Sequence, residues 1–563
     1  MGVAPSGIYE TIRRRPFSFL LGLLMVASAA LLIHYRSGLN FMLDDWAFVV
    51  YREDGGIGDF LDPHNEHISI LPVAIYKLFL SVFGMGSAMP LQVFSVLIFL
   101  LSVFALYLYL RPLVGEPAAV IGCAVILFFG SAFEDLLWAF QIGFSLSVAG
   151  GIGALIMLRR QDAFGDRIAC LLLTVSIIST SLGIPFAVGA AVCLLLQRND
   201  LWRRLYVVAV PILIYGLWYL GWGHTAESSL SIQNVGHAPG YIARSFALTV
   251  SELTGISKLI VDDGAFHNTA LGVLCGLIGM AAIAYGVLRQ GRIPRPLLVA
   301  AAIALTFWGL AALNLAPGRG FQASRYQFPN AVFVLMILAG TYEGYRPKAR
   351  MLAALGLIAL VAIAANIEAL RNGYNDLFKP LADKGIAGMT AVDIARNTVS
   401  PGLEVGISAD DSARITAGAY LEAEKKYGSL TWSESEIEQA SPAARERVDQ
   451  ILVSALPVLS TPIESFRGTG LTRYSCQTVT AGTAGSEQAI PLPDRTFSFR
   501  PQESAFLAFG RYGDGASTGA AFAEAGVKTL VNVPADDSDE PWRIGFLGEG
   551  KVRVCPVKPQ PLR

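Results

Sequence analysis

The sequence predicts a mainly α-helical protein that crosses a membrane about eleven times and ends in an α+β domain outside the membrane. Hydrophobic residues make up 53% of the 563 residues and charged residues only 15%, and the mean hydropathy is +0.50. A soluble globular chain of this length needs far less apolar sequence. Because the apolar runs stop near residue 368, we expect a transmembrane bundle over residues 1–368 and a separate domain over residues 369–563.

The first predicted span covers residues 17–33 and directly follows Arg13, Arg14 and Arg15. No small-residue cleavage site leads from it into a soluble chain, so we expect a retained helix and not a signal peptide. Apolar runs of roughly 20 residues, enough to cross about 30 Å of hydrocarbon, predict further spans at residues 91–110, 118–133, 138–158, 205–221, 270–288, 297–315, 328–342 and 351–366.

Residues 168–196 are apolar but are interrupted by Ser179, Thr180, Ser181 and Pro185. This run is too long for one span and too short for two full ones. It predicts a hairpin of two short helices whose irregular tip lines a cavity.

The basic residues predict the topology, because cytoplasmic loops carry most of the Lys and Arg. They gather on the side that holds the N-terminus, and an odd number of spans then puts the C-terminal domain outside the cytoplasm. We therefore expect a multi-pass protein of the plasma (inner) membrane. Outside the cytoplasm Cys476 and Cys555 would lie in an oxidising compartment, where the sequence is compatible with a disulfide or with two thiols.

The C-terminal domain is predicted to begin with helices, at residues 415–428 and 440–456, and to end as a β-sandwich-like module. Short strands separated by Gly, Asp and Pro are expected at residues 495–501, 504–513, 528–534, 542–548 and 551–557. The glycine-rich residues 513–519 follow no strand that opens a helix, so they predict turns and not a phosphate-binding loop.

Two adjacent carboxylates, Asp44 and Asp45, follow the first span and open the loop of residues 39–72. Carboxylates at the edge of a bilayer are costly to desolvate, so a side-by-side pair indicates a chemical use. The alternative is that one of them caps an interfacial helix beginning at Trp46. Trp46 itself is a candidate for stacking on a sugar, with the aromatic belt of the membrane interface as the alternative.

The same loop contains a compact group of His64, Glu66 and His67. Imidazole and carboxylate groups suit a divalent cation, or an acceptor hydroxyl. The alternative is a solvated loop that caps a helix over residues 68–79. No cofactor is certain from the sequence, and a divalent cation is the one candidate.

Two further short turns are predicted on the same outer face. One contains Glu134 and Asp135, and the other contains Arg319, Arg325 and Tyr326. Simple turn formation is the alternative for the acids, and snorkelling to the lipid headgroups is the alternative for Arg325. Tyr326 is a second candidate for sugar stacking.

Acids and arginines on one face of an apolar bundle suit a reaction that needs a base and a cation for an anionic leaving group. Sugar transfer from a polyprenyl phosphate has these needs, since its tail lies in the lipid and its phosphate at the interface. The formal net charge of −1 argues against a nucleic-acid partner.

The Asp-Asp pair after the first span, the second acidic site, the late Ser-Arg-Tyr turn and the outer C-terminal domain together resemble the GT-C superfamily of membrane glycosyltransferases. Over roughly residues 13–366 the chain is similar to the polyprenyl-phosphate-sugar-dependent enzymes related to the protein mannosyltransferases and the arabinosyl- and aminoarabinose transferases. The resemblance implies that Asp44, or else Asp45, is the catalytic base. It also implies a second acidic site at Glu134 or Asp135 and a phosphate contact at Arg325.

The function expected from this resemblance is inverting transfer of a hexose or pentose to a glycan, lipid or protein acceptor of the cell envelope. The His64–His67 group and the C-terminal domain match no motif of the family. A transporter or flippase of lipid-linked saccharides, or an envelope polysaccharide assembly protein, is the alternative. A transporter or flippase would use polar residues at mid-membrane depth and access from both sides, whereas an assembly protein that binds through its C-terminal domain would leave the acids of the bundle without a role.

Overall fold

The computed structural model describes residues 16–52, 55–198, 200–226, 228–256, 270–405, 415–456, 459–462, 472–473, 476–482, 489–492, 495–516, 518–536 and 538–558. The chain divides into two compact units. The first comprises Met1–Gly38, Asp54–Phe79 and Met89–Phe378, and the second comprises Leu39–Glu53, Leu80–Ala88 and Lys379–Arg563. The predicted boundary after residue 368 stays a prediction, because the second unit also contains the two short early segments Leu39–Glu53 and Leu80–Ala88.

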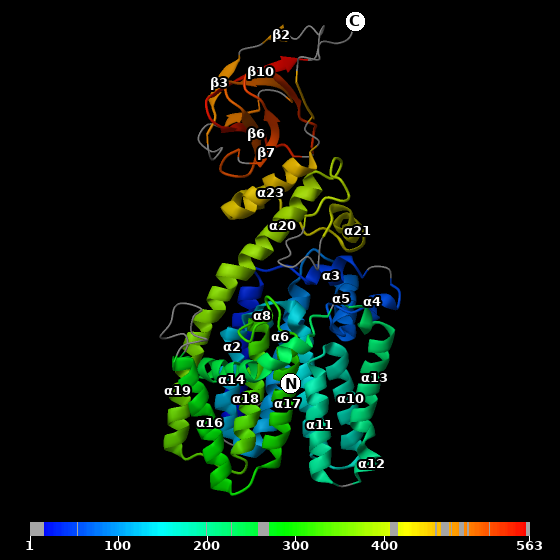
Figure 1. Ribbon diagram of the computed structural model, residues 1–563, viewed down its shortest axis with the longest axis vertical. Helices are drawn as coiled ribbons and strands as arrows, with labels where there is room; N and C mark the ends of the chain where they lie inside the picture. The colour runs from blue at the N-terminus through cyan, green and yellow to red at the C-terminus, as the bar shows by residue number, and fades with distance from the viewer. Residues whose placement is uncertain are drawn as a thin grey trace, which may run out of the picture. The chain divides into compact units, whose positions relative to one another are not determined.

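The regular secondary structure described in the first unit is helical, apart from an isolated β-bridge between His64 and His67 (Figure 1). Its helices in chain order are α2 (Pro16–Arg36), α4 (Gly58–Leu61), α5 (Ile70–Phe83, which continues into the second unit), α6 (Met89–Val114), α7 (Glu116–Leu127), η1 (Gly130–Ala132), α8 (Phe133–Leu137), η2 (Ala139–Gln141), α9 (Ile142–Leu158), α10 (Ala163–Ser179), α11 (Gly183–Gln197), α12 (Leu201–Arg204), α13 (Tyr206–Gly221), η3 (Gly223–Thr225), η4 (Ile232–His237), α14 (Ala238–Thr254), α16 (Ala270–Gln290), α17 (Arg295–Leu313), α18 (Ser324–Thr341), α19 (Ala349–Asn372) and η6 (Gly373–Phe378).

Among the described residues, six helices are long and apolar enough to cross a membrane, or seven if a bent pair counts as one span. The six are Pro16–Arg36, Met89–Val114, Ala139–Leu158, Leu271–Gln290, Arg295–Leu313 and Ala349–Ile394. The chain therefore has the helices of a membrane protein, and the total of eleven stays a prediction. The predicted hairpin forms as two helices of 17 and 15 residues, α10 and α11, on either side of a break at residues 180–182.

The bent pair consists of Glu116–Leu127 and Gly130–Leu137, with an angle of 42° between its halves. Glu134 and Asp135 lie in the second half, inside α8, so the turn predicted for them is a short helix. Gly130 allows this bend to approach α19 closely, because a Cβ there would lie 1.8 Å from the main-chain oxygen of Asn366.

The second unit begins with α3 (Asp45–Val50) and has four further helices among its described residues: α20 (Lys379–Ile394), α21 (Ala417–Tyr427), α22 (Glu434–Gln439) and α23 (Pro442–Ala455). Short polar residues start three of them. Thr416 accepts a hydrogen bond from Ala419 N–H at the start of α21, and Ser433 forms a capping box with Glu436 at α22. Ser441 caps α23, whose first residue is Pro442. The two helices predicted in this region are thereby confirmed.

Two antiparallel sheets follow the helices. The first has the order β1-β8-β5-β10-β2 with β3 also paired to β10, and the second has the order β4-β9-β6-β7. The strands are β1 (Leu459–Pro462), β2 (Thr472–Arg473), β3 (Gln477–Thr480), β4 (Ile490–Pro491), β5 (Thr496–Pro501), β6 (Ala505–Gly510), β7 (Thr518–Ala523), β8 (Thr529–Asn532), β9 (Arg543–Gly548) and β10 (Lys551–Lys558). All five predicted strands are present, as β5, β6, β8, β9 and β10.

The rings of Phe499 in β5 and Phe546 in β9 meet at 5.2 Å between their centres and join the two sheets. A disulfide joins Cys476 to Cys555, which resolves the alternative that the sequence left open. Val554 of β10 pairs with Gln477 of β3, so the antiparallel register brings Cys555 opposite Cys476.

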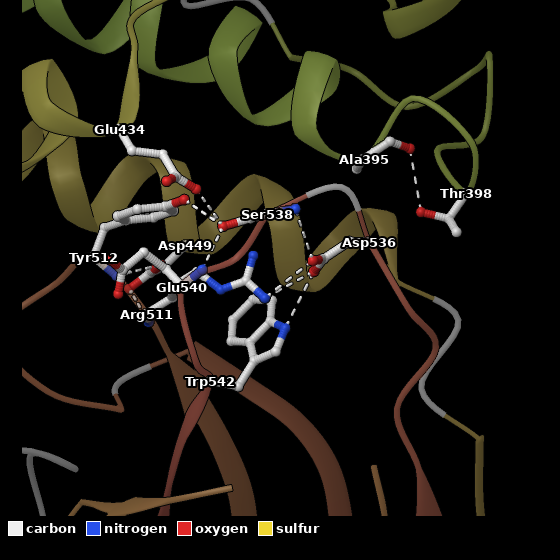
Figure 2. A network of polar contacts seen from close by, with 10 residues as sticks. All are labelled: Ala395, Thr398, Glu434, Asp449, Arg511, Tyr512, Asp536, Ser538, Glu540 and Trp542. Carbon is white, nitrogen blue, oxygen red and sulfur yellow. Dashed lines mark hydrogen bonds and ion pairs between the residues drawn. The ribbon is translucent and has the colours of Figure 1, made fainter.

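A buried polar network holds the loop of residues 511–513 against α23 (Figure 2). Both carboxylate oxygens of Asp449 accept main-chain N–H bonds, from Arg511, Tyr512 and Gly513 at 2.8–3.0 Å. Arg511 also forms an ion pair with Asp536 at 2.9 Å. Because the side chains of Asp449, Arg511 and Asp536 are buried and paired, this network links α23 to the loops between the strands within the second unit.

Candidate active site

The turn between α17 and α18 carries Arg319 and Arg325. Arg319 N–H donates to the carbonyl of Ala316 at 2.9 Å, and Gly318 has φ +74°. Pro317 and Gly318 thus occupy the two central positions of a type II turn, which favours Pro first and Gly second. We call residues 316–325 the arginine turn.

Arg325 lies at the start of α18 and pairs with Glu134 of α8. Its Nη1 is 3.4 Å from Glu134 Oε2, and its Nη2 donates to the carbonyl of Gly318 at 2.7 Å. Its guanidinium also lies 5.5 Å from the centre of the Tyr326 ring. The acidic and basic segments predicted on one face therefore meet at Glu134 and Arg325.

Arg319 pairs with Glu66, a contact that the sequence did not predict. Glu66 lies in a tight turn in which the main chains of His64 and His67 exchange two N–H to O bonds of 3.0 Å. Asn65 adopts φ +51°, a conformation that Asn tolerates better than most residues. The turn projects the Glu66 carboxylate toward the arginine turn.

His67 connects this turn to the tip of the α10–α11 hairpin. Its Nδ1 and the hydroxyl of Ser181 lie at a hydrogen-bond distance of 3.1 Å. Removal from water lowers the pKa of His67 to about 4, and the neighbouring Glu66 opposes this shift while Arg319 promotes it. His67 is therefore a neutral imidazole near pH 7. The other imidazole, His64, packs edge-on against Phe140.

Asp135 is 2% exposed, and neither carboxylate oxygen has a hydrogen-bond partner among the described residues. Its main-chain oxygen lies 3.4 Å from Nη2 of the buried Arg36, which also donates to the carbonyl of Leu136 at 2.8 Å. A carboxyl group buried in this way is costly, and such groups are often found where a protein does chemistry.

A series of hydrogen bonds from α19 fixes the main chain of Glu134. Asn366 Oδ1 accepts from both the N–H and the hydroxyl of Ser131 at 3.0 Å. The Ser324 hydroxyl donates to the Ser131 carbonyl at 2.9 Å and accepts from Glu134 N–H at 3.2 Å. These residues fix α8 against the start of α18, so they set the position of Glu134 relative to Arg325.

Asp44, Asp45 and Trp46 belong to the second unit. Asp44 is at the N-cap position of α3 but makes no capping side-chain bond, whereas Asp45 Oδ2 accepts from Met42 N–H at 3.0 Å. Trp46 is 2% exposed and packs against the rings of Phe41 and Tyr420. Its ring has a packing role, and stacking on a sugar would require these contacts to break. The role predicted for Asp44 as a base stays a prediction.

No group of three or more His, Cys, Asp or Glu side chains is arranged to hold a metal ion within the part of the chain that the structure describes. In the His64–His67 turn, the carboxylate of Glu66 is paired with Arg319. The use of this turn for a divalent cation or for an acceptor hydroxyl stays a prediction.

Sequence reasoning missed Ser181, Ser131, Ser324 and Asn366. For two of them the sequence contains a feature that could have identified them. Ser181 lies at the hairpin tip that was predicted to line a cavity, and Asn366 is a polar residue within an apolar helix, which often indicates a helix contact or a function.

No family model, curated protein or solved structure matches this chain. The arginine turn presents two cations, each paired with a carboxylate, beside a neutral imidazole. Paired arginines of this kind can exchange a carboxylate for a phosphate group, which they bind through two parallel N–H bonds.

Proposed function

We propose that this protein is an integral-membrane glycosyltransferase. It moves a sugar from a polyprenyl-phosphate donor to a glycan, lipid or protein acceptor on the extracytoplasmic face. The observation that carries the proposal is the arginine turn, where Arg319 and Arg325 are held by Glu66 and Glu134 at the ends of apolar helices. Guanidinium groups at such a position suit a lipid phosphate, which would replace a carboxylate partner while its tail stays in the bilayer.

The proposed reaction is a direct displacement. The oxygen of an acceptor hydroxyl attacks the anomeric carbon, and the bond from that carbon to the phosphate oxygen breaks. Its electron pair leaves with the polyprenyl phosphate, whose growing charge Arg325 and Arg319 stabilise. Asp44 accepts the acceptor's proton, and the anomeric configuration inverts.

The protein is proposed to lie in the plasma membrane with its C-terminal unit on the extracytoplasmic side, and two features support this topology. The Cys476–Cys555 disulfide is typical of an oxidising compartment. The Arg-rich segments that alternate with the apolar runs are typical of cytoplasmic loops. Both features favour chemistry with a lipid-linked donor, because nucleotide sugars are cytoplasmic.

The base is tested by measuring sugar transfer from labelled polyprenyl-phosphate sugars in membranes that contain the Asp44→Asn variant. General-base catalysis contributes roughly 10²- to 10⁴-fold, so turnover should fall at least a hundredfold. Asp376→Asn, the same change at an exposed carboxylate of η6, is the matched control and should transfer normally. Near-normal turnover by Asp44→Asn would remove the assigned base.

A further inference from the structure

An apolar pocket of about 600 Å³ lies within the first unit, between α14, α16 and α17. Its walls include Val273, Leu277 and Met280 of α16 and Leu305 and Trp308 of α17. The indole N–H of Trp308 donates to Asn330 Oδ1 at 2.8 Å, so the pocket meets only the apolar part of this ring. A sugar or a peptide would lose its hydrogen bonds to water in such a pocket, whereas a hydrocarbon chain would gain by burial.

Arg244 of α14 is the one charged residue among the described residues that line the pocket. Its guanidinium lies 5.9 Å from the centre of the Phe321 ring, and Phe321 belongs to the arginine turn. Tyr241, one helical turn before Arg244, packs edge-on against the same ring at 6.1 Å. The charged end of the pocket therefore adjoins the turn that carries Arg319 and Arg325.

We propose that this pocket binds the part of the donor's isoprenoid chain nearest to the phosphate, with Arg244 beside the phosphate itself. This inference rests on the proposed function and adds to it a place for the lipid. Its support is the match of chemistry: hydrocarbon walls, a cation among the described lining residues, and the contact of that cation with Phe321 of the arginine turn. A polyprenyl phosphate has the same order of parts, a long apolar chain that ends in an anion.

The length of the pocket also sets how many isoprene units of the lipid it can bind. Along α16 its lining runs from Gly272 to Ile283, which is about 16 Å at 1.5 Å per residue. An extended hydrocarbon chain advances about 1.2 Å per bond, the same as an extended polypeptide, which advances about 3.6 Å over the three backbone bonds of a residue. The pocket thus accommodates about fourteen bonds, or between three and four isoprene units of four bonds each. A fifteen-carbon chain should nearly fill it, and longer chains should add little.

The test measures binding of radiolabelled farnesyl phosphate to the purified full-length protein in detergent, with unlabelled lipids as competitors. Geranylgeranyl phosphate should compete within about twofold of farnesyl phosphate, because its additional unit extends beyond the pocket. Geranyl phosphate, one unit shorter than farnesyl phosphate, should compete at least tenfold more weakly. Farnesol, which lacks the phosphate, should also compete about tenfold more weakly.

Three variants locate the site. Arg244→Gln should weaken the binding of farnesyl phosphate about tenfold and leave the binding of farnesol unchanged. Ala301→Phe fills the pocket and should weaken the binding of both ligands. Ala281→Phe, on an exposed part of α16 outside the pocket, is the matched control and should change neither.

Equal competition by all chain lengths would overturn the proposal, and so would displacement by phosphatidylglycerol as strong as that by geranylgeranyl phosphate. The latter result would mark an ordinary lipid contact. If the protein transfers sugar but Arg244→Gln and Ala301→Phe leave the KM for the donor unchanged, the pocket assignment alone fails. If the lipids bind as expected but no donor supports transfer, the glycosyltransferase proposal fails and the lipid site stands.

Discussion

Replacing Arg325 by alanine should raise the KM for the polyprenyl-phosphate donor. A phosphate charge about 4 Å from the guanidinium is attracted by roughly 4 kcal/mol at an effective dielectric constant of 20. The net gain from a hydrogen bond to a charged group is smaller, about 1.5–3 kcal/mol. Because Glu134 lies 3.4 Å from Arg325 and already offsets part of its charge, we expect the lower end of this range, a rise of about tenfold.

The assay is the initial rate of sugar transfer in proteoliposomes at varied donor concentration. The value of kcat/KM should fall further than KM rises, since negative charge grows on the departing phosphate. Arg325→Lys keeps the charge without the planar fork and should have an intermediate effect. Arg292→Ala, at an exposed arginine of another loop, is the control. If Arg325→Ala leaves both the KM for the donor and kcat/KM unchanged, the phosphate role is refuted.

Three other predictions concern stability and positioning. Replacing Cys476 and Cys555 by serine frees a loop with a sequence separation of 79 residues and should cost about 4.5 kcal/mol in the chain-entropy model; an unchanged thermal or denaturant midpoint of the C-terminal unit would contradict this. The pKa of His67 is lower in the folded protein (about 4) than in the unfolded chain (about 6.5), so the unfolded chain binds the proton first as the pH falls. The free energy of unfolding should therefore decrease between pH 6.5 and pH 4, and His67→Gln should flatten this dependence in pH-resolved melting curves; a wild-type curve that is flat over the same window would reject the shift. Asn366→Leu leaves Ser131 without two hydrogen bonds and should cost about 1–3 kcal/mol, together with a loss of activity that Asn366→Gln partly restores; full activity of the leucine variant would show that this bond chain does not position Glu134.

Local patterns were sufficient to predict much of the secondary structure. Alternating apolar residues with turn residues between them predicted five strands, and helical patterning predicted α21 and α23. The strand β7 was missed because its sequence, Thr518–Ala523, is rich in alanine and glycine, which are poor strand formers. It forms because β6 pairs with it along its length.

The candidate site was predictable in part. The identity of Glu134 and Arg325 followed from acids and arginines at the ends of apolar runs, and the structure pairs them. The pairing of Glu66 with Arg319 joins segments 253 residues apart, and no local pattern specifies such a distant contact. Helix packing decides it, as it decides the bond from Asn366 to Ser131 across 235 residues.

The central step of the proposed function is the breaking of the bond between a sugar and a polyprenyl phosphate. The direct measurement uses the purified protein in liposomes with donors that carry mannose, arabinose or aminoarabinose. We expect release of polyprenyl phosphate in equal amount to the sugar transferred, and a product whose anomeric configuration is opposite to that of the donor. Intact donor with every sugar and acceptor, or a product that keeps the donor's configuration, would contradict the proposed chemistry.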